Sequence, residues 1–304
     1  MDNISKVCSE ISIVKSDNVR NSRMGLFQYL STIWASREVL YNLTLREIRG
    51  QYKRTALGQL WSLANPLAAM LIYTFIFSFL FRLPLEEGEP SGLKSYALWL
   101  LVGLLPWMFF SRVMNMGTGV LVVNAPLIQK VYFPRAIMPL SLVGVVGFNW
   151  LFEMGVLVIA LLIAGAFVLP WLPLVLVVMA LLGLFAAGIA LIFSITNVNF
   201  RDVEHAVTVF TQIWLYLTPV IYPISLVETQ SERLGGLFGT NITLLGIYEA
   251  NPLVSYISAF RILLYDNRMP SPEIWIGCFG WSFLALGCGI ALFARYEKRL
   301  AELL

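Results

Sequence analysis

The sequence predicts an all-α membrane protein with six transmembrane helices, and its composition is the first observation behind this prediction. Of the 304 residues, 58% are hydrophobic and 13% are charged, and the mean hydropathy is +0.76. An ordinary soluble domain carries about twice that share of charged residues. Because a soluble domain must also cover its surface with polar groups, this composition excludes a soluble protein.

Long apolar stretches are the second observation. A bilayer core of about 30 Å requires roughly 20 apolar residues in a helix. Five stretches are apolar and long enough to predict spans by themselves, at residues 63–81, 137–169, 174–197, 206–224 and 274–294. A sixth span, 96–121, contains Pro106 and is long enough only if its helix continues toward Leu121. Residues 63–294 are therefore predicted to form one transmembrane domain.

The distribution of basic residues is the third observation. With six spans, sixteen of the 21 Lys and Arg residues fall on the side that holds both termini. Positive residues stay cytoplasmic, so a leader (residues 1–32) and a tail (residues 295–304) are both predicted to be cytosolic. The leader lacks the short apolar core of a signal peptide, so we expect it to be retained.

Residues 33–62, before the first span, mix apolar and basic side chains. This pattern predicts an amphipathic helix in the cytosolic membrane interface. Four of its basic residues could attract the head group of an anionic lipid, at about 1 kcal/mol each: Arg46, Arg49, Lys53 and Arg54. Simple anchoring to the membrane explains the same pattern and is the simpler interpretation.

The region 225–272, between the last two spans, is apolar but too interrupted to cross the membrane twice. Short helices that enter the outer leaflet fit it better, because irregular backbone at that depth must pack on protein or line a wet cavity. Asn251 followed by Pro252 is typical of a helix start.

Several kinds of chemistry are excluded by the sequence. No Gly-Lys pair occurs, so a Walker A phosphate loop is excluded. With His205 as the single histidine and no paired carboxylates in a predicted cytosolic segment, we expect neither a metal site nor enzymatic activity. Glu153 is the one acidic residue deep inside a predicted span, where a functional role is the default. Since no partner base is evident in its plane, we expect a hydrogen bond between helices or subunits, for example with Asn149.

Five blocks resemble, in their order, the polysaccharide and polyol-phosphate exporter permeases of the ABC-2 class of ABC transporters. They are LTLREIRGQYKRTALGQLWSLANPL (43–67), GLLPWMFF (103–110), NAPLIQKVYFPRAIMPL (124–140), NVNFRDVEHAVTVFTQIWLYLTPVIYP (197–223) and NPLVSYISAFR (251–261). The ordered set covers most of residues 40–265. The leader and residues 228–248 lie outside the pattern, and no family property is transferred to them.

The resemblance implies a homodimer of six-span subunits in the bacterial cytoplasmic membrane. Two copies of a separate ATPase subunit would bind ATP and Mg²⁺, and this chain would hold no cofactor. The implied substrate is a polymer such as O-antigen, capsule or teichoic acid, usually on a polyprenyl diphosphate lipid, and not nucleic acid. Neither the glycan nor recognition of an end-cap on it follows from the sequence.

The resemblance also implies a cytosolic coupling helix that contacts the ATPase. Its residues would be Gln129, Lys130, Tyr132, Phe133, Pro134 and Arg135, with Arg201 and Asp202 as a second contact. Pro134 and Pro139 restrict the backbone where the chain re-enters the bilayer, so that a push would move the following span. A basic membrane anchor is the alternative for the first group. A helix N-cap is the alternative for Asp202.

A hydrated glycan requires a wide path whose surfaces bind it weakly. Aromatic rings suit such a path, because the C–H faces of sugars stack on them without a fixed hydrogen-bond pattern. The candidates are Tyr73, Phe77, Trp107, Phe109, Phe110, Trp214 and Tyr216. Core packing and membrane-interface positions are the alternative for each. The stretch from Asn251 to Leu264 resembles the family's outer gate, to which we assign Asn251, Pro252 and Arg261.

Other classes of protein remain as alternatives. An ABC-2 permease for a drug or a lipid would share the fold but not the same ordered blocks. An ion-coupled transporter would require more charge inside the spans. A membrane glycosyltransferase is disfavoured because paired carboxylates are missing from the sequence.

Overall fold

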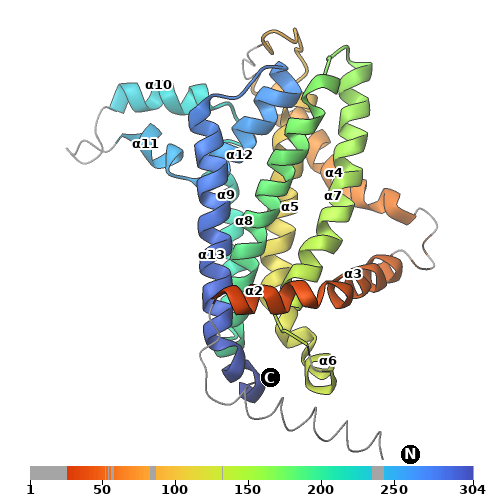
Figure 1. Ribbon diagram of the computed structural model, residues 1–304. Helices are drawn as coiled ribbons and strands as arrows, with labels where there is room; N and C mark the ends of the chain where they lie inside the picture. Colours follow the sequence, from red (N-terminus) through yellow and green to blue (C-terminus); the bar gives the residue numbers. More distant parts are fainter. Residues whose placement is uncertain are drawn as a thin grey trace, which may run out of the picture.

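The computed structural model describes residues 26–51, 53, 55, 58–82, 87–131, 133–234 and 243–303 (Figure 1). Within these ranges, five helical segments are long and apolar enough to cross a membrane. They are Gly58–Leu80, which contains α4 (Ala64–Tyr73), then α5 (Tyr96–Val123), α7 (Ile137–Ile163), Leu169–Asn199, which contains α8 (Leu172–Asn199), and Pro272–Glu297 of α13 (Pro272–Leu303). The predicted span that contains Pro106 is thus confirmed as one helix.

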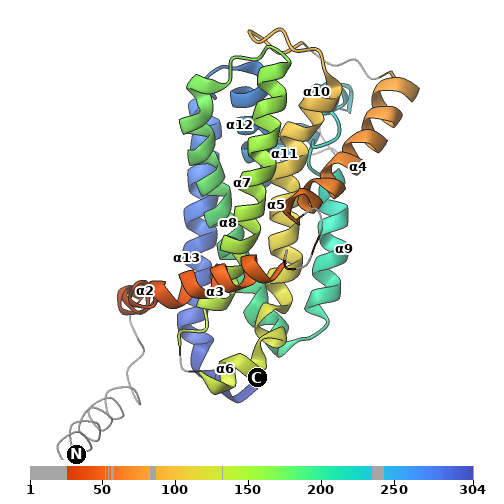
Figure 2. The same ribbon diagram turned by 90° about the vertical axis from the view of Figure 1, so that its right-hand side faces the viewer.

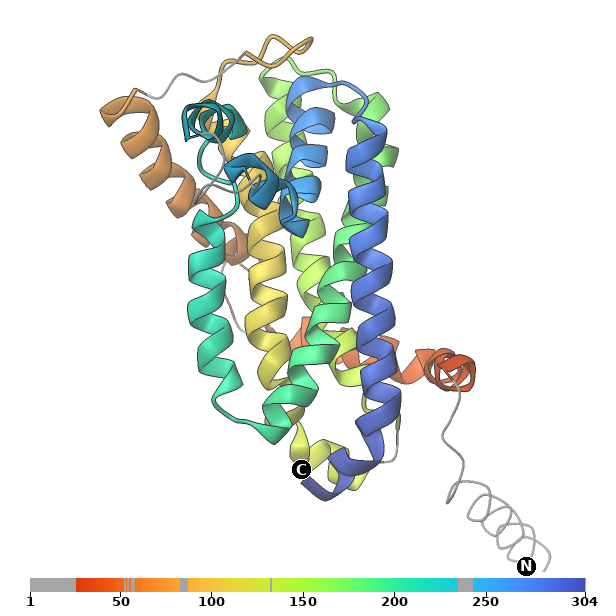
Figure 3. The same ribbon diagram turned by 90° about the vertical axis from the view of Figure 1, so that its left-hand side faces the viewer.

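Four of these helices form the packed core. α5 contacts both α7 and α8, and α8 contacts α13, so the helices stand side by side along most of their length (Figures 2 and 3). α4 leans away from the bundle and keeps most of its side chains exposed (Figure 2). The core is therefore built by the second to fourth spans and the last one.

The seam between α8 and α13 depends on glycine. A Cβ atom at Gly188 would overlap the backbone of Ala285, and one at Gly289 would lie 2.6 Å from the carbonyl oxygen of Gly188. Small residues let membrane helices approach closely, which increases their van der Waals contact. α8 and α13 therefore form a closely joined pair.

The predicted span at residues 206–224 is not confirmed as a single helix. α9 (Val203–Tyr216) has 14 residues and a length of about 21 Å, which is short of the bilayer core. It runs beside α5 from the end that carries α6 (Ala125–Lys130) toward the opposite end (Figure 3). Below, these are called the α6 end and the far end of the bundle.

Three short helices gather at the far end, within the region 225–272 or at its edge, and their place in the outer leaflet stays a prediction. They are α10 (Ile224–Leu234), α11 (Leu244–Glu249) and α12 (Pro252–Arg261), and a π-helical turn (Ile262–Asp266) extends α12 (Figure 1). α12 packs on α5, α8 and α13, because its residues such as Leu253, Tyr256 and Phe260 are apolar or aromatic and buried.

The predicted interfacial segment forms two helices. α2 (Leu26–Ala35) and α3 (Arg37–Gln51) run across the bundle near the α6 end (Figures 1 and 2). α3 is attached to α7, because Asn149 donates a hydrogen bond to the Gln51 side chain at 3.0 Å. The alternative that Asn149 pairs with Glu153 is therefore wrong.

Candidate functional site

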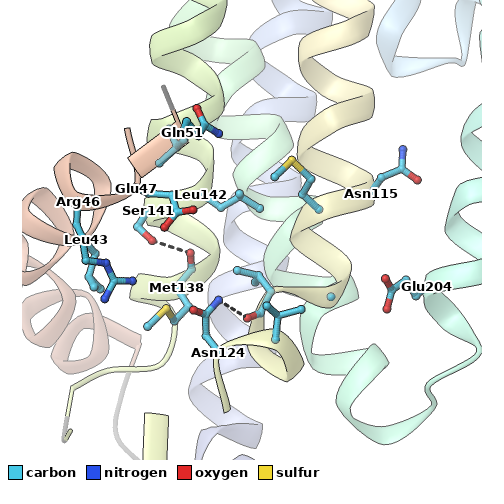
Figure 4. A pocket seen from close by; sticks show the side chains of 15 residues that line it. Leu43, Arg46, Glu47, Gln51, Asn115, Asn124, Met138, Ser141, Leu142 and Glu204 are labelled. Atoms are coloured by element: carbon cyan, nitrogen blue, oxygen red, sulfur yellow. Dashed lines mark hydrogen bonds between the residues drawn. The ribbon is translucent and has the colours of Figure 1, made fainter. Parts of the chain in front are cut away.

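A pocket of about 320 Å³ lies near the α6 end, between α3, α5, α7 and α9. Arg46 and Glu47 of α3 form one side, and Glu204 in the first turn of α9 lies on the other (Figure 4). The remaining lining residues are Leu43, Gln51, Asn115, Met116, Gly119, Val120, Val123, Asn124, Met138, Ser141, Leu142 and Val145. We call this the α3 pocket.

The α3 pocket is lined by side chains of both charges. Of the predicted head-group residues that are described, Arg46 lines it, whereas Arg49 and Lys53 are exposed outside it. Arg54 lies outside the described residues. The carboxylates of Glu47 and Glu204 would repel a bound diphosphate, and this repulsion is stronger where the site is partly shielded from water. The pocket therefore does not form the purely basic site that the sequence pattern suggested.

An ion pair lies inside the bundle, farther from the α6 end than the α3 pocket. Arg112 of α5 donates to Glu153 of α7, with 2.6 Å between Nη1 and Oε1. The Glu153 side chain is 0% exposed and the Arg112 side chain 27%. The predicted contact between helices is confirmed, but the expectation that Glu153 has no partner base was wrong.

Three of the seven aromatic candidates for the export path are packed inside the subunit. Phe109 stacks on Trp150, with ring centroids 4.2 Å apart, and Phe110 stacks on Phe185 at 5.5 Å. Trp107 is buried as well. In this conformation these rings have no surface to offer a polymer, so their assignment as path-lining residues is corrected to core packing.

The other four candidates keep exposed surface. Tyr73, Phe77 and Trp214 are half-buried, and Tyr216 is 58% exposed at the end of α9. Tyr73 and Tyr216 lie on α4 and α9, beside the same side of α5. Their role as path-lining residues stays a prediction.

At the far end, the loop of residues 217–223 interrupts the α9 segment and is held by the side chain of Arg261. The Arg261 guanidinium donates to the carbonyl oxygens of Pro219 and Val220, each at 2.6 Å. It also lies 3.6 Å from the ring centroid of Trp99. Backbone carbonyls away from water must find donors, and arginine supplies several in one plane.

Asn251 joins the same loop to α12. Its side chain accepts from the backbone N–H of Leu253 at 3.1 Å and from Trp214 at 3.0 Å, and it donates to the carbonyl oxygen of Leu217 at 3.2 Å. Asn251 is thus the N-cap of α12 with Pro252 in the first turn, as predicted.

Two tyrosines complete the loop's hydrogen bonds. Tyr96 donates to the carbonyl oxygen of Ile221 and Tyr222 donates to that of Tyr216, each at 2.6 Å. Neither tyrosine was identified from the sequence. Pro219 and Pro223 are the signal that could have marked the break, since proline removes a helical hydrogen bond and restricts its neighbour.

The predicted coupling segment lies at the α6 end and divides into exposed and buried residues. Lys130 ends α6 and is exposed, whereas Phe133 is buried in the core of the subunit. Tyr132 lies outside the described residues. Phe133 therefore cannot insert into another protein from this conformation, which corrects its assignment as a contact residue.

Arg135 is also engaged within the subunit. Its backbone N–H donates to Oε1 of Glu297 at 2.8 Å, and its guanidinium donates to the Glu297 carbonyl oxygen at 2.6 Å. Its assignment as a direct partner contact is corrected in the same way.

Burial, with the Glu297 carboxylate nearby, raises the pKa of Tyr29 of α2 above its ordinary value.

The second predicted contact lies in the turn between α8 and α9, also at the α6 end (Figure 3). Arg201 and Asp202 are both exposed, and no ion pair between them is found among the described residues. Asp202 stands at the N-cap of α9 but makes no capping hydrogen bond. Both side chains are therefore free to face a partner, together with Lys130.

Comparison with known proteins shows the family to which the chain belongs. The model of the family described as ABC-2 type transporter matches residues 38–265. The chain is 31% identical over 271 residues to the O-antigen export system permease protein RfbA of Klebsiella pneumoniae, covering 88% of this chain and 95% of that protein. It is 26% identical over 278 residues to RfbA of Myxococcus xanthus, covering 91% and 99%. It is also 26% identical over 194 residues to the polysialic acid transport protein KpsM of Escherichia coli, covering 62% and 71%.

Proposed function

Because this chain belongs to the ABC-2 type transporter family, we propose that it is the membrane permease of an exporter that moves a polysaccharide out of a bacterial cell. The observation that carries this proposal is the similarity to O-antigen export permeases along nearly the full length of both chains. The polysialic acid transporter extends the range to capsule-type polymers. A drug or lipid exporter of the same family is the alternative, and no observation favours it.

The finer proposal concerns the substrate and the lipid that carries it. We propose a polymer on a polyprenyl diphosphate, of the O-antigen, capsule or teichoic acid kind. The exposed Arg49 and Lys53 support an approach of the diphosphate along α3, because about 1 kcal/mol of attraction per basic residue acts near the membrane surface. The α3 pocket, with its carboxylates, suits hydroxyl groups better than phosphate.

The energy source must lie in another protein, because the sequence has no Gly-Lys pair and hence no Walker A loop. We propose a homodimer of this chain with two ATPase subunits, which bind ATP and Mg²⁺. The α6 end and both termini would then face the cytosol, and α10, α11 and α12 would lie in the outer leaflet. In this arrangement Lys130, Arg201 and Asp202 form the contact surface for the ATPase.

Replacing Lys130 by glutamate tests this contact surface. The variant reverses one exposed charge without touching the core, so the subunit should accumulate normally in the membrane. We expect weaker co-purification of the ATPase and at least a severalfold fall in surface polymer, because like charges oppose association. The measurement is the ratio of ATPase to permease after mild detergent extraction, together with surface polymer.

Arg37→Glu is the matched control, since Arg37 is also exposed near the α6 end but lies outside α6. It should retain the ATPase and export normally. If Lys130→Glu binds the ATPase and exports as well as this control, α6 is not the contact surface.

A further inference from the structure

The elbow between α6 and α7, of which residues 131 and 133–136 are described, is hydrogen-bonded to α13 near its C-terminal end. Arg135 and Glu297 contact each other twice: the main chain of Arg135 donates to the side chain of Glu297, and the side chain of Arg135 donates to the main chain of Glu297. The Arg135 N–H lies at the start of α7, where no helical carbonyl is available. Glu297 thus supplies the missing acceptor from α13.

A third element, α2, packs near the contact between Arg135 and Glu297. The side chain of Tyr29 from α2 is 2% exposed, and α2 contacts α13. Figure 1 shows α2 crossing α13 above the end that lies beside α6. The elbow is therefore held against α13 and is not a loop attached only to α7.

α13 is connected to the rest of the molecule in two further places. Its glycine seam joins it closely to α8. Nearer the far end, the hydroxyl of Tyr256 on α12 donates to the carbonyl oxygen of Cys278 at 2.9 Å and lies 2.7 Å from Oγ of Ser282. Ser282 in turn donates to the carbonyl oxygen of Leu181 on α8 at 2.8 Å. Displacement of α13 would thus carry both α8 and α12 with it.

We propose that Glu297 is a positioning residue that links the coupling elbow to α13, so that movement of α6 reaches α12 at the far end of the bundle. The proposal rests on the proposed function. It differs from a push on α7 alone, because α7 follows the elbow through the chain, whereas α13 is joined to the described part of the elbow by the hydrogen bonds of Arg135 with Glu297. Without the Glu297 side chain, the bond from the Arg135 guanidinium to the main-chain carbonyl remains but the Arg135 N–H loses its acceptor. The weakened link lets ATP hydrolysis continue but moves α12 poorly.

The test uses the permease together with its ATPase in inverted membrane vesicles from cells that make the polymer. Two quantities are measured: ATP hydrolysed, and polymer moved into the lumen, where it is protected from an added glycosidase. For Glu297→Ala we expect polymer moved per ATP to fall about tenfold, the factor that corresponds to about 1.4 kcal/mol. This ratio does not depend on how much subunit is present, so a loss of stability alone would not change it.

Two conservative variants identify the contact. Glu297→Gln keeps an acceptor oxygen at the same reach and should restore the ratio, whereas Glu297→Asp withdraws the acceptor by one methylene and should behave like the alanine variant. A normal ratio in Glu297→Ala, or the reverse order of Gln and Asp, would overturn the proposal. If the wild-type vesicles themselves show no ATP-dependent export, the proposed function fails instead.

Discussion

Replacing Arg261 by alanine is expected to remove most of the folded subunit and with it most of the export. Arg261 satisfies the carbonyl oxygens of Pro219 and Val220 and lies on the ring of Trp99. Hydrogen bonds to a charged group contribute about 1.5–3 kcal/mol each, and a desolvated cation–π contact about 2 kcal/mol. Even after allowing for the cost of burying the guanidinium, the loss is about 3–5 kcal/mol. That is a large part of the stability of an ordinary domain.

The measurement is the amount of monodisperse subunit after detergent extraction, with its unfolding temperature. Arg268→Ala is the matched control, since Arg268 is exposed at the same end and forms a surface pair with Asp266 at 3.3 Å. Surface pairs of this kind contribute about 0–1 kcal/mol. Arg261→Lys should restore only part of the stability, because a single ammonium group cannot replace the planar guanidinium with its several donors. A fully stable Arg261→Ala would mean that the loop does not depend on this side chain.

The second large effect is expected at the intramembrane pair of Arg112 and Glu153. Of the two single changes, Arg112→Met should be the more harmful, at about 3–5 kcal/mol, because the Glu153 carboxylate is fully buried and would remain without a partner. Glu153→Met should cost less, because the Arg112 side chain is 27% exposed and can reach water or lipid head groups. The double replacement should be close to wild type in stability.

Unfolding in detergent, compared among the four proteins, checks this order. Additive losses in the double variant would show that the two side chains do not act as a pair. If the double variant is stable but no longer exports, the pair also has a role in transport. The stability prediction would still hold in that case.

The helical class and most of the spans could be predicted because long apolar runs determine them directly. The failure at residues 206–224 has a physical cause. Hydropathy continues through the segment, but the helix ends at Tyr216 because the following backbone is bonded by side chains from other helices. Pro219 and Pro223 were the local evidence for the break, and hydropathy does not take account of proline.

Residue roles were harder to predict than helices. Phe133 and Arg135 were assigned by resemblance to a partner surface, yet both are directed into the subunit. An aromatic ring in an apolar segment has the same sequence signature whether it lines a path or packs in a core, as Phe110 shows. The partner of Glu153 lies on another helix 41 residues away. Only the packing of helices reveals such pairs.

The most direct test of the central claim uses the purified chain in lipid vesicles loaded with carrier-linked polymer, with and without its ATPase subunit. We expect that polymer crosses the membrane only when both proteins and ATP are present, and that the chain alone moves none. Transport by the chain alone, or transport that continues without ATP, would contradict it.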